Sequence, residues 1–413
     1  MSIYELERNG DVQALAEMLV TAESASVRYQ AAQALGDLDT PEDGSTGEYE
    51  QMFSALRSAA IEDDDSRVRA TAVSGLEGHG IDQLKRLISD LGGRPTDQIG
   101  VKTYVRLLKS ERPEIRMVGL AAIGLEGTPA IGNPVIMAIQ DTDPRVRERA
   151  IYTASNLGLS RAEPTLISAL SDEVVAVRAA AATAIGELNL TNGIDPLVNA
   201  TDDEEDTVRL AALDSLAGLG SPAAIDPLAE ALGSSVASVN RLAVYGLLEL
   251  LANASGSGSH MIRERVEHVA SDVQGRVVID TLIDLLEQIS GTPQRRNAVW
   301  LLGQLIDRQP AEAEVEALIE HVGDEDEQTA KLATSALVRC EGPVVERIAR
   351  LKLESLGPDA RATGQLAYLL GRVGSDRSID SLEATLDGTN DETVRKRVVG
   401  ALNRLEASRG VTG

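Results

Sequence analysis

The side chains best suited to catalysis or metal binding are few and scattered along this sequence. The four histidines, His79, His260, His268 and His321, are isolated, and none forms a His-Glu pair. Metal sites require several ligands brought close together, so these histidines indicate ordinary structural roles. The single cysteine, Cys340, stands where equivalent segments carry leucine, and we expect it to be a buried apolar residue rather than a nucleophile.

Sequence signatures of nucleotide-binding and hydrolytic enzymes are absent as well. The chain contains no G-x-G-x-x-G, no Gly-Lys-Ser/Thr ending of a phosphate-binding loop and no G-x-S-x-G nucleophile elbow. Acidic runs such as "TDDEEDT" and "GDEDEQT" lack the ligand spacing of a calcium loop. We therefore predict a protein that is not an enzyme and that needs no cofactor or metal.

One charged phrase, "DTDPRVRERAIYTASNLG" from Asp141 to Gly158, combines acids and bases closely enough to suggest acid–base chemistry. Variants of it return along the chain, among them "DDDSRVRATAVSGLEG" and "DEEDTVRLAALDSLAGLG". A catalytic cluster has no reason to recur many times, whereas the turns of a repeated fold do. The charges therefore indicate an Asp-rich turn that caps a helix.

Composition excludes several classes of partner. The net charge is −26, with 65 acidic residues against 39 basic ones, so we expect neither nucleic-acid binding nor attraction to an anionic membrane. Only six of the basic residues are lysines, a composition that resembles proteins of salt-loving archaea. There is no secretion signal and no apolar run long enough to span a bilayer, which predicts a soluble, cytoplasmic protein.

An arginine that usually follows valine or isoleucine marks a repeated unit. It defines eleven marker positions, and arginine occupies all of them except Asn240, Ala330 and Thr363. The marker positions are 28, 69, 116, 147, 178, 209, 240, 295, 330, 363 and 395. From 116 to 240 their spacing is a constant 31 residues, which indicates a repeated structural unit.

Wider spacing elsewhere indicates insertions, which we predict to be loops. They lie near residues 40–50 and 92–100, and a third, 253–261, is expected to be a flexible loop followed by an additional helix. The predicted division is thus an N-terminal repeat region over 1–252 and a C-terminal one over 262–413. The letters "SGSGSHM", Ser255 to Met261, also resemble a cleavage scar from an expression vector. We favour a natural loop, because repeats continue on both sides.

Each unit has the pattern of a helical hairpin. Positions −1, +3, +7 and +10 from the marker are mostly small or aliphatic and share one face of a helix, and small residues at +3 allow close packing. A second helical piece precedes the Asp-rich turn, and its early proline suits a first helical turn. No unit can bury its apolar faces alone, so the units must stack into an all-α solenoid of about eleven repeats.

This pattern resembles HEAT repeats, in particular the short variety named after phycobilisome lyases, from Asp11 to Leu405. The resemblance specifies a fold rather than an activity, because such solenoids serve as scaffolds, adaptors and a few enzymes. Some HEAT-like proteins of salt-loving archaea are linked to taxis signalling between the response regulator and the archaellum motor. The resemblance thus implies a scaffold or adaptor, with taxis as one specific role.

The face of the second helix opposite the core is the predicted binding surface, which would line the concave side of the solenoid. Offset +5 on this face carries four of the nine aromatic residues of the chain, and offsets +1 and +9 carry basic residues in the C-terminal repeats. The candidate partner-binding residues are Tyr152, Arg241, Tyr245, Arg296, Trp300, Lys331, Arg339, Tyr368, Arg372, Lys396 and Arg404. Residues 241–413 carry a net charge of −7 against −19 for residues 1–240, so the C-terminal part repels an acidic partner less.

Two alternatives remain open. The aromatic residues at +5 could instead pack between neighbouring repeats; replacing Trp300 and Arg296 together would then reduce stability rather than partner binding alone. The chain also resembles a HEAT-like DNA glycosylase in having a candidate pair, Trp300 and Asp307, but it lacks a broadly basic groove. We therefore expect the partner to be a protein or an acidic peptide segment of one, and leave the oligomeric state open.

Overall fold

The computed structural model is built from α-helices. It describes residues 3–39, 47–127, 129–232, 236–253, 258–272, 275–357 and 360–409. Within these ranges no strand occurs, which confirms the all-α prediction. Two compact units divide the chain, 1–215 and 216–413, which we call unit 1 and unit 2. This division lies within a helix, whereas the sequence predicted one at the loop after residue 252.

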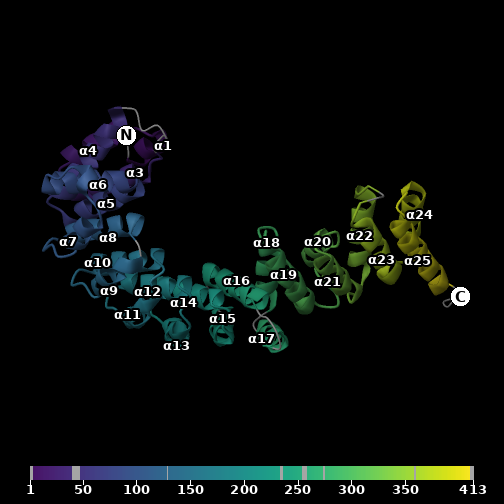
Figure 1. Ribbon diagram of the computed structural model, residues 1–413. Coiled ribbons are helices and arrows are strands. Elements are labelled where there is room, and N and C mark those ends of the chain that lie inside the picture. Colours follow the sequence, from purple (N-terminus) through teal and green to yellow (C-terminus); the bar gives the residue numbers. More distant parts are fainter. Residues whose placement is uncertain are drawn as a thin grey trace. The chain divides into compact units, whose positions relative to one another are not determined.

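Helical hairpins follow the predicted repeat. Each of the eleven marker positions lies in the second helix of a hairpin. These second helices are α3 (Ala25–Asp37), α5 (Ser66–Gly78), α8 (Pro113–Glu126), α10 (Pro144–Asn156), α12 (Val175–Glu187), α14 (Asp206–Gly218), α16 (Ala237–Asn253), α19 (Thr292–Leu305), α21 (Glu327–Val338), α23 (Thr363–Val373) and α25 (Glu392–Arg409). The sequence period thus located the second helix of every repeat (Figure 1).

The first helices are shorter on average and are often entered through a single 3-10 turn. They are α2 (Val12–Thr21), α4 (Gly47–Glu62), α6 (Ile81–Gly92) with α7 (Val101–Leu107), α9 (Gly132–Ala138), α11 (Glu163–Ala169), α13 (Ile194–Ala200), α15 (Ile225–Leu232), α18 (Gly275–Leu286), α20 (Glu312–Glu320), α22 (Pro343–Ser355) and α24 (Ile379–Gly388). The 3-10 turns are η1 (Thr96–Gln98), η2 (Pro129–Ile131), η3 (Ser160–Ala162), η4 (Thr191–Gly193), η5 (Pro222–Ala224) and η6 (Asp376–Ser378). Two further helices, α1 (Ile3–Asn9) and α17 (Gly258–Asp272), lie outside this pairing.

The expected insertions are partly helical. Residues 40–46 lie outside the described residues, but α4 already begins at Gly47, within the first expected loop. In the second, α6 ends at Gly92 and is followed by Gly93, whose backbone is left-handed (φ 62°), and then by η1 and α7. The predicted additional helix after the third insertion is α17, which begins at Gly258 inside the expected loop; residues 254–257 are not described.

Core packing follows the predicted offsets, as α10 illustrates. Val146, Ala150 and Ala154 at −1, +3 and +7 are completely buried, and Leu157 at +10 is nearly so. Small side chains also let neighbouring second helices approach closely. A Cβ atom on Gly36 of α3 would lie 2.8 Å from the Cα atom of Gly75 in α5, so these two helices cross at a pair of glycines.

The marker arginines form an ordered ladder that joins successive repeats in unit 1. Arg147 of α10 donates one hydrogen bond to the backbone carbonyl of Asp141 in its own turn (3.0 Å) and pairs with Asp172 of the next turn (2.7 Å). Asp172 in turn accepts from the backbone N–H of Val174 (2.9 Å). Each such rung, a marker arginine paired with the turn of the next repeat, therefore fixes two turns and the contact between their helices.

Four other rungs occur in unit 1. Arg28–Asp63 (2.7 Å), Arg116–Asp141 (2.6 Å) and Arg178–Asp203 (2.7 Å) repeat the Arg147–Asp172 geometry. The turn before α8 has Ser110 in place of the aspartate, and Arg69 pairs instead with the buried Glu114 (2.9 Å). In unit 2 the described residues contain one rung of this type, Arg295–Asp324 (2.7 Å).

Other acids of the turns cap helices, as the sequence predicted. Asp143 accepts a hydrogen bond from the backbone N–H of Arg145 at the start of α10, and Asp65 and Asp326 cap α5 and α21 in the same way. Cys340 is buried, as predicted, and its thiol contacts the carbonyl of Ala336 (3.4 Å). No helix in the described ranges is long and apolar enough to cross a membrane.

Candidate functional site

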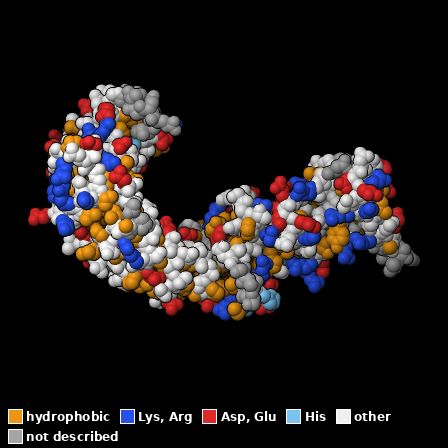
Figure 2. Space-filling model, in the orientation of Figure 1, with side chains coloured by type: hydrophobic (Ala, Val, Ile, Leu, Met, Phe, Trp, Pro, Cys, Tyr) orange, Lys and Arg blue, Asp and Glu red, His pale blue; other side chains and the backbone are white. Residues whose placement is uncertain are grey.

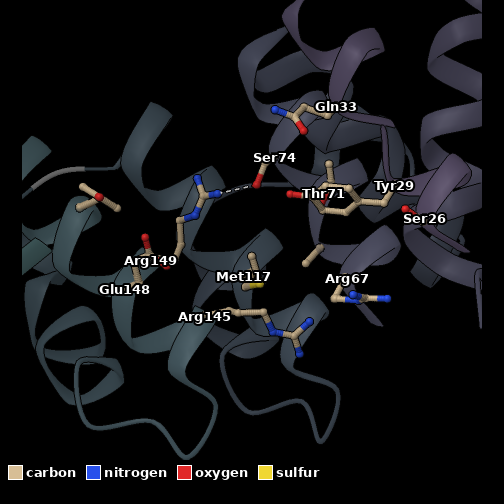
Figure 3. Close-up of a pocket in the computed structure, with 12 residues that line it drawn as sticks. Ser26, Tyr29, Gln33, Arg67, Thr71, Ser74, Met117, Arg145, Glu148 and Arg149 are labelled. Atoms are coloured by element: carbon tan, nitrogen blue, oxygen red, sulfur yellow. Dashed lines mark hydrogen bonds between the residues drawn. The ribbon is translucent and has the colours of Figure 1, made fainter. Parts of the chain in front are cut away.

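The second helices of unit 1 form a hollow of about 640 Å³ on the face opposite the core. Helices α3, α5, α8 and α10 supply its walls, and Met117 of α8 lies between the two sides (Figure 3). The lining residues are Ser26, Tyr29, Gln33, Arg67, Ala70, Thr71, Ser74, Met117, Arg145, Glu148, Arg149 and Tyr152. A volume of this size falls in the range of ligand-binding clefts.

The lining residues repeat at fixed offsets from the markers. Offset −2 supplies Arg67 and Arg145, offset +1 supplies Tyr29 and Glu148, and offset +5 includes Tyr152. The tyrosines remain well exposed, Tyr29 by 38% and Tyr152 by 46%. The face predicted from the sequence is therefore hollowed and aromatic, but in the N-terminal repeats.

Every arginine of the hollow has an acidic partner of its own. Arg67 pairs with Asp65 (2.8 Å) and Arg145 with Asp143 (2.7 Å). Arg149 pairs with Glu77 and donates a hydrogen bond to the hydroxyl of Ser74 (2.7 Å), reaching from α10 to α5 across one side of the hollow (Figure 3). The basic groups therefore contribute little uncompensated positive charge.

Glu148 is the exception among the charged groups of the hollow. It is half-buried, and within the part of the chain that the structure describes it makes no hydrogen bond or ion pair. Burial raises the pKa of its carboxyl group above the ordinary value. Burial and the charge of Glu148 likewise raise the pKa of Tyr152. This carboxylate is thus a charge without a partner beside an exposed aromatic ring.

Most of the predicted basic residues in unit 2 are engaged within the chain. Arg296 of α19 makes a two-bond ion pair with Asp326 (2.8 and 2.9 Å), and Arg339 donates to the carbonyl of Gly303. The other contacts are Lys331–Glu327 (2.7 Å), Lys396–Glu392 (3.8 Å) and Arg241–Gln288. These side chains are exposed to differing degrees, but each already has a polar contact.

Two of the predicted aromatic residues in unit 2 carry stacked arginines. The guanidinium of Arg263 from α17 lies 5.1 Å from the ring centre of Trp300, so an additional helix covers this ring. Asp307, the other residue of the pair in the glycosylase alternative, lies exposed beyond the end of α19. Tyr245 is 40% exposed on α16.

Tyr368 forms the clearest local cluster among the predicted residues. The guanidinium groups of Arg372 and Arg404 lie 5.7 and 5.6 Å from its ring centre, so α23 and α25 jointly present an aromatic ring between two cations. A hydrogen bond from Arg372 (3.4 Å) and both positive charges lower the pKa of the Tyr368 hydroxyl. We call these three residues the C-terminal cluster. Basic side chains are visible over this part of unit 2 in Figure 2.

Sequence reasoning selected Tyr152, which lines the hollow, but missed its neighbours. Tyr29 stands at +1 rather than +5, and Arg67 and Arg145 stand at −2, an offset outside the predicted face. The sequence did contain a signal for these neighbours, because offsets −2 and +1 lie on the same side of a helix as offset +5. The described residues contain no group of three or more His, Cys, Asp or Glu side chains arranged to hold a metal ion.

Stacked helical hairpins, joined by an arginine ladder and hollowed on their second helices, define an α-solenoid repeat protein. A family profile for HEAT repeats matches residues 12–91 and 163–249. A HEAT repeat-containing taxis protein of Halobacterium salinarum is 40% identical over 410 residues, which cover 98% of each chain. The chain therefore belongs to the HEAT-repeat family, while the phycobilisome-lyase variety remains a prediction.

Solved structures give weaker similarity. An engineered protein of known crystal structure aligns with 96% of this chain and 99% of its own at a TM-score of 0.43 and 17% identity. Importin beta aligns with 97% of this chain and 58% of its own at a TM-score of 0.41 and 14% identity.

Proposed function

We propose that the protein is a non-enzymatic scaffold of taxis signalling, which binds a protein partner through the exposed face of its second helices. The hollow of unit 1 carries this proposal, because it sets Tyr29 and Tyr152 in a concave surface built from several repeats. Tyrosine is among the side chains that contribute most to protein interfaces. The taxis role rests on the name of the haloarchaeal relative.

The C-terminal cluster supports a second contact, with an acidic segment of the partner. Arg372 and Arg404 are exposed, and their guanidinium groups lie over the Tyr368 ring, which favours these positions. A guanidinium positioned in advance loses less conformational freedom when it binds a carboxylate. The overall function does not depend on this contact, which adds specificity for one part of the partner.

Complementation tests the proposal. In a strain that lacks the gene, wild-type protein is expected to restore taxis rings on semi-solid agar and to capture the partner from a high-salt cell extract. The double variant Tyr29→Ala, Tyr152→Ala is expected to lose both, with affinity for the captured partner falling at least tenfold. Half-exposed rings contribute little to the fold, so its melting temperature should stay close to that of the wild type.

The matched control is Tyr4→Ala, which removes a tyrosine that is 71% exposed on α1, outside the second-helix face. It should behave like the wild type in both assays. Full taxis and undiminished capture by the hollow variant would refute binding through this face.

A further inference from the structure

The charge balance of the hollow in unit 1 points to a particular kind of occupant. Arg67, Arg145 and Arg149 are neutralised by their own acidic partners, whereas Glu148 has no such partner among the described residues. A half-buried carboxylate without a partner has lost part of its hydration and gained nothing in return. A cation that enters the hollow would supply the missing interaction.

The aromatic walls have the same preference. A guanidinium or ammonium group is attracted to the face of a tyrosine ring. In the part of the chain that the structure describes, such contacts occur on Trp300 and Tyr368 of unit 2, where arginines of the chain itself supply the cation. Tyr29 and Tyr152 have no guanidinium of this kind over their rings among the described residues, although both are well exposed. Their ring faces remain accessible to a cation from outside.

The net charge of unit 1 also favours a cationic occupant. Residues 1–215 contain 36 acidic side chains and 19 basic ones, so unit 1 attracts positively charged surfaces. Concentrated salt screens this attraction beyond a few ångströms, and then only a direct contact distinguishes one partner from another. Glu148 lies on α10 four residues before Tyr152, on the same side of the helix, and is suited to make that contact.

We propose that the hollow binds an arginine or lysine side chain of the partner protein, which pairs with Glu148 and stacks on Tyr152, one turn further along α10. The inference rests on the proposed function, since it specifies the chemistry of the surface through which the scaffold binds. An acidic residue is excluded as the preferred occupant, because it would meet Glu148 and find each arginine already paired.

Three labelled peptides of equal length test this chemistry on the full chain. All are built from Gly and Ser except at the centre, which holds Arg, its uncharged analogue citrulline, or Glu. Fluorescence polarisation should show the Arg peptide binding about tenfold more tightly than the citrulline peptide, which corresponds to about 1.4 kcal/mol. The Glu peptide should bind most weakly, and a preference for it would overturn the proposal.

Two variants show which residue causes the preference for the Arg peptide over the citrulline peptide. Glu148→Gln keeps the shape of the side chain and should bring the Arg and citrulline peptides to equal affinity. Glu17→Gln on α2 removes the same charge at an exposed site outside the hollow and should preserve the tenfold difference. A preference that survives in Glu148→Gln would show that the cation binds elsewhere. Tyr152→Leu should weaken the Arg peptide more than the citrulline peptide.

The capture assay keeps this inference separate from the proposed function. If the tyrosine double variant loses the partner but Glu148→Gln binds it with unchanged affinity, the chemistry assigned to the hollow is wrong and the scaffold function stands. If neither variant affects capture, the proposed binding face fails, and the peptide titration still decides whether the hollow prefers a cation.

Discussion

The two units hold their repeats together in different ways. In unit 1, five consecutive marker arginines reach the turn of the next repeat, and four of the acceptors are aspartates at the same position of that turn. In unit 2, the described residues show one such rung, because asparagine, alanine and threonine replace three marker arginines. The same hairpin therefore stacks with or without the ladder, and apolar packing is the shared requirement.

Arginine and tyrosine are also combined differently in the two units. In unit 2, arginines of α17, α23 and α25 lie over the rings of Trp300 and Tyr368. In unit 1, the marker arginines are used between repeats, and the rings of Tyr29 and Tyr152 face the hollow. The comparison shows that where the marker arginines join successive repeats, the rings of Tyr29 and Tyr152 have no arginine of the described chain stacked on them.

Acidification should produce the largest difference in stability between the two units, because protonation of the aspartates breaks many rungs at once. The hydrogen bond from Arg178 lowers the pKa of Asp203 below its ordinary value of 3.8. Burial alone would raise the pKa of Asp63, but hydrogen bonds from Arg28 and from the backbone outweigh burial and lower this pKa as well. Unfolded carboxylates bind protons before folded ones, so this stability is complete above about pH 4 and declines as pH falls further. Unit 1 should unfold at a higher pH than unit 2.

Circular dichroism and fluorescence separate the units in this titration. The single tryptophan, Trp300, reports on unit 2, whereas helix content reports on both units. Loss of part of the helical signal before any change in Trp300 emission is the expected order. If Trp300 responds first, the ladder does not set the acid stability of unit 1.

Removal of one rung should have the next largest effect. Arg147→Met preserves much of the side-chain volume but leaves Asp172, which is 13% exposed, without its cation. We expect unit 1 to lose about 2–4 kcal/mol, because an uncompensated charge remains in a mostly buried site. In urea, the first helical transition should move to lower concentration while the Trp300 transition stays in place.

The control for this rung is an exposed ion pair of unit 2. Arg308 and Glu341 are 82% and 59% exposed, so Arg308→Met should cost less than about 0.5 kcal/mol. Equal losses in the two variants would contradict a special role for the ladder.

The fold could be predicted from the sequence because its signals are local and repeated. A marker such as Arg147, with small or aliphatic residues at −1, +3, +7 and +10, specifies both a helix and its buried face. The boundaries of the insertions were less accessible, since Gly258 starts a helix within a Gly/Ser-rich segment. Glycine is a poor helix former, so the composition of this segment gave no sign of a helix.

The site was harder to predict, because side-chain partners come from other repeats. Offsets placed Tyr152 and Arg296 on comparable faces, yet one lines a hollow and the other pairs with Asp326 of the following repeat. Neither the repeat register nor the composition shows in which direction an arginine side chain extends. The ion pairs of Arg67, Arg145 and Arg149, and the lack of one for Glu148 within the described part of the chain, likewise become visible only in the structure.

Replacement of Arg296 should have the smallest effect on stability, and this effect should be confined to unit 2. Its guanidinium binds both carboxylate oxygens of Asp326, the residue that caps α21 through the backbone N–H of Thr329. Arg296→Gln should therefore cost unit 2 about 0.5–1 kcal/mol, a modest figure because a third of the arginine side chain is exposed. The Trp300 melting transition should fall, and the helical transition of unit 1 should not move.

Lys331→Gln is the matched control, since its pair with Glu327 lies on the surface of a single helix. It should change the Trp300 transition by less than about 0.5 kcal/mol. If Arg296→Gln leaves stability unchanged and weakens partner capture, Arg296 is a binding residue as the sequence suggested. A loss of stability with normal capture would place it with the ladder arginines, so that α19 has a second contact, beside Arg295–Asp324, with the turn of the next repeat.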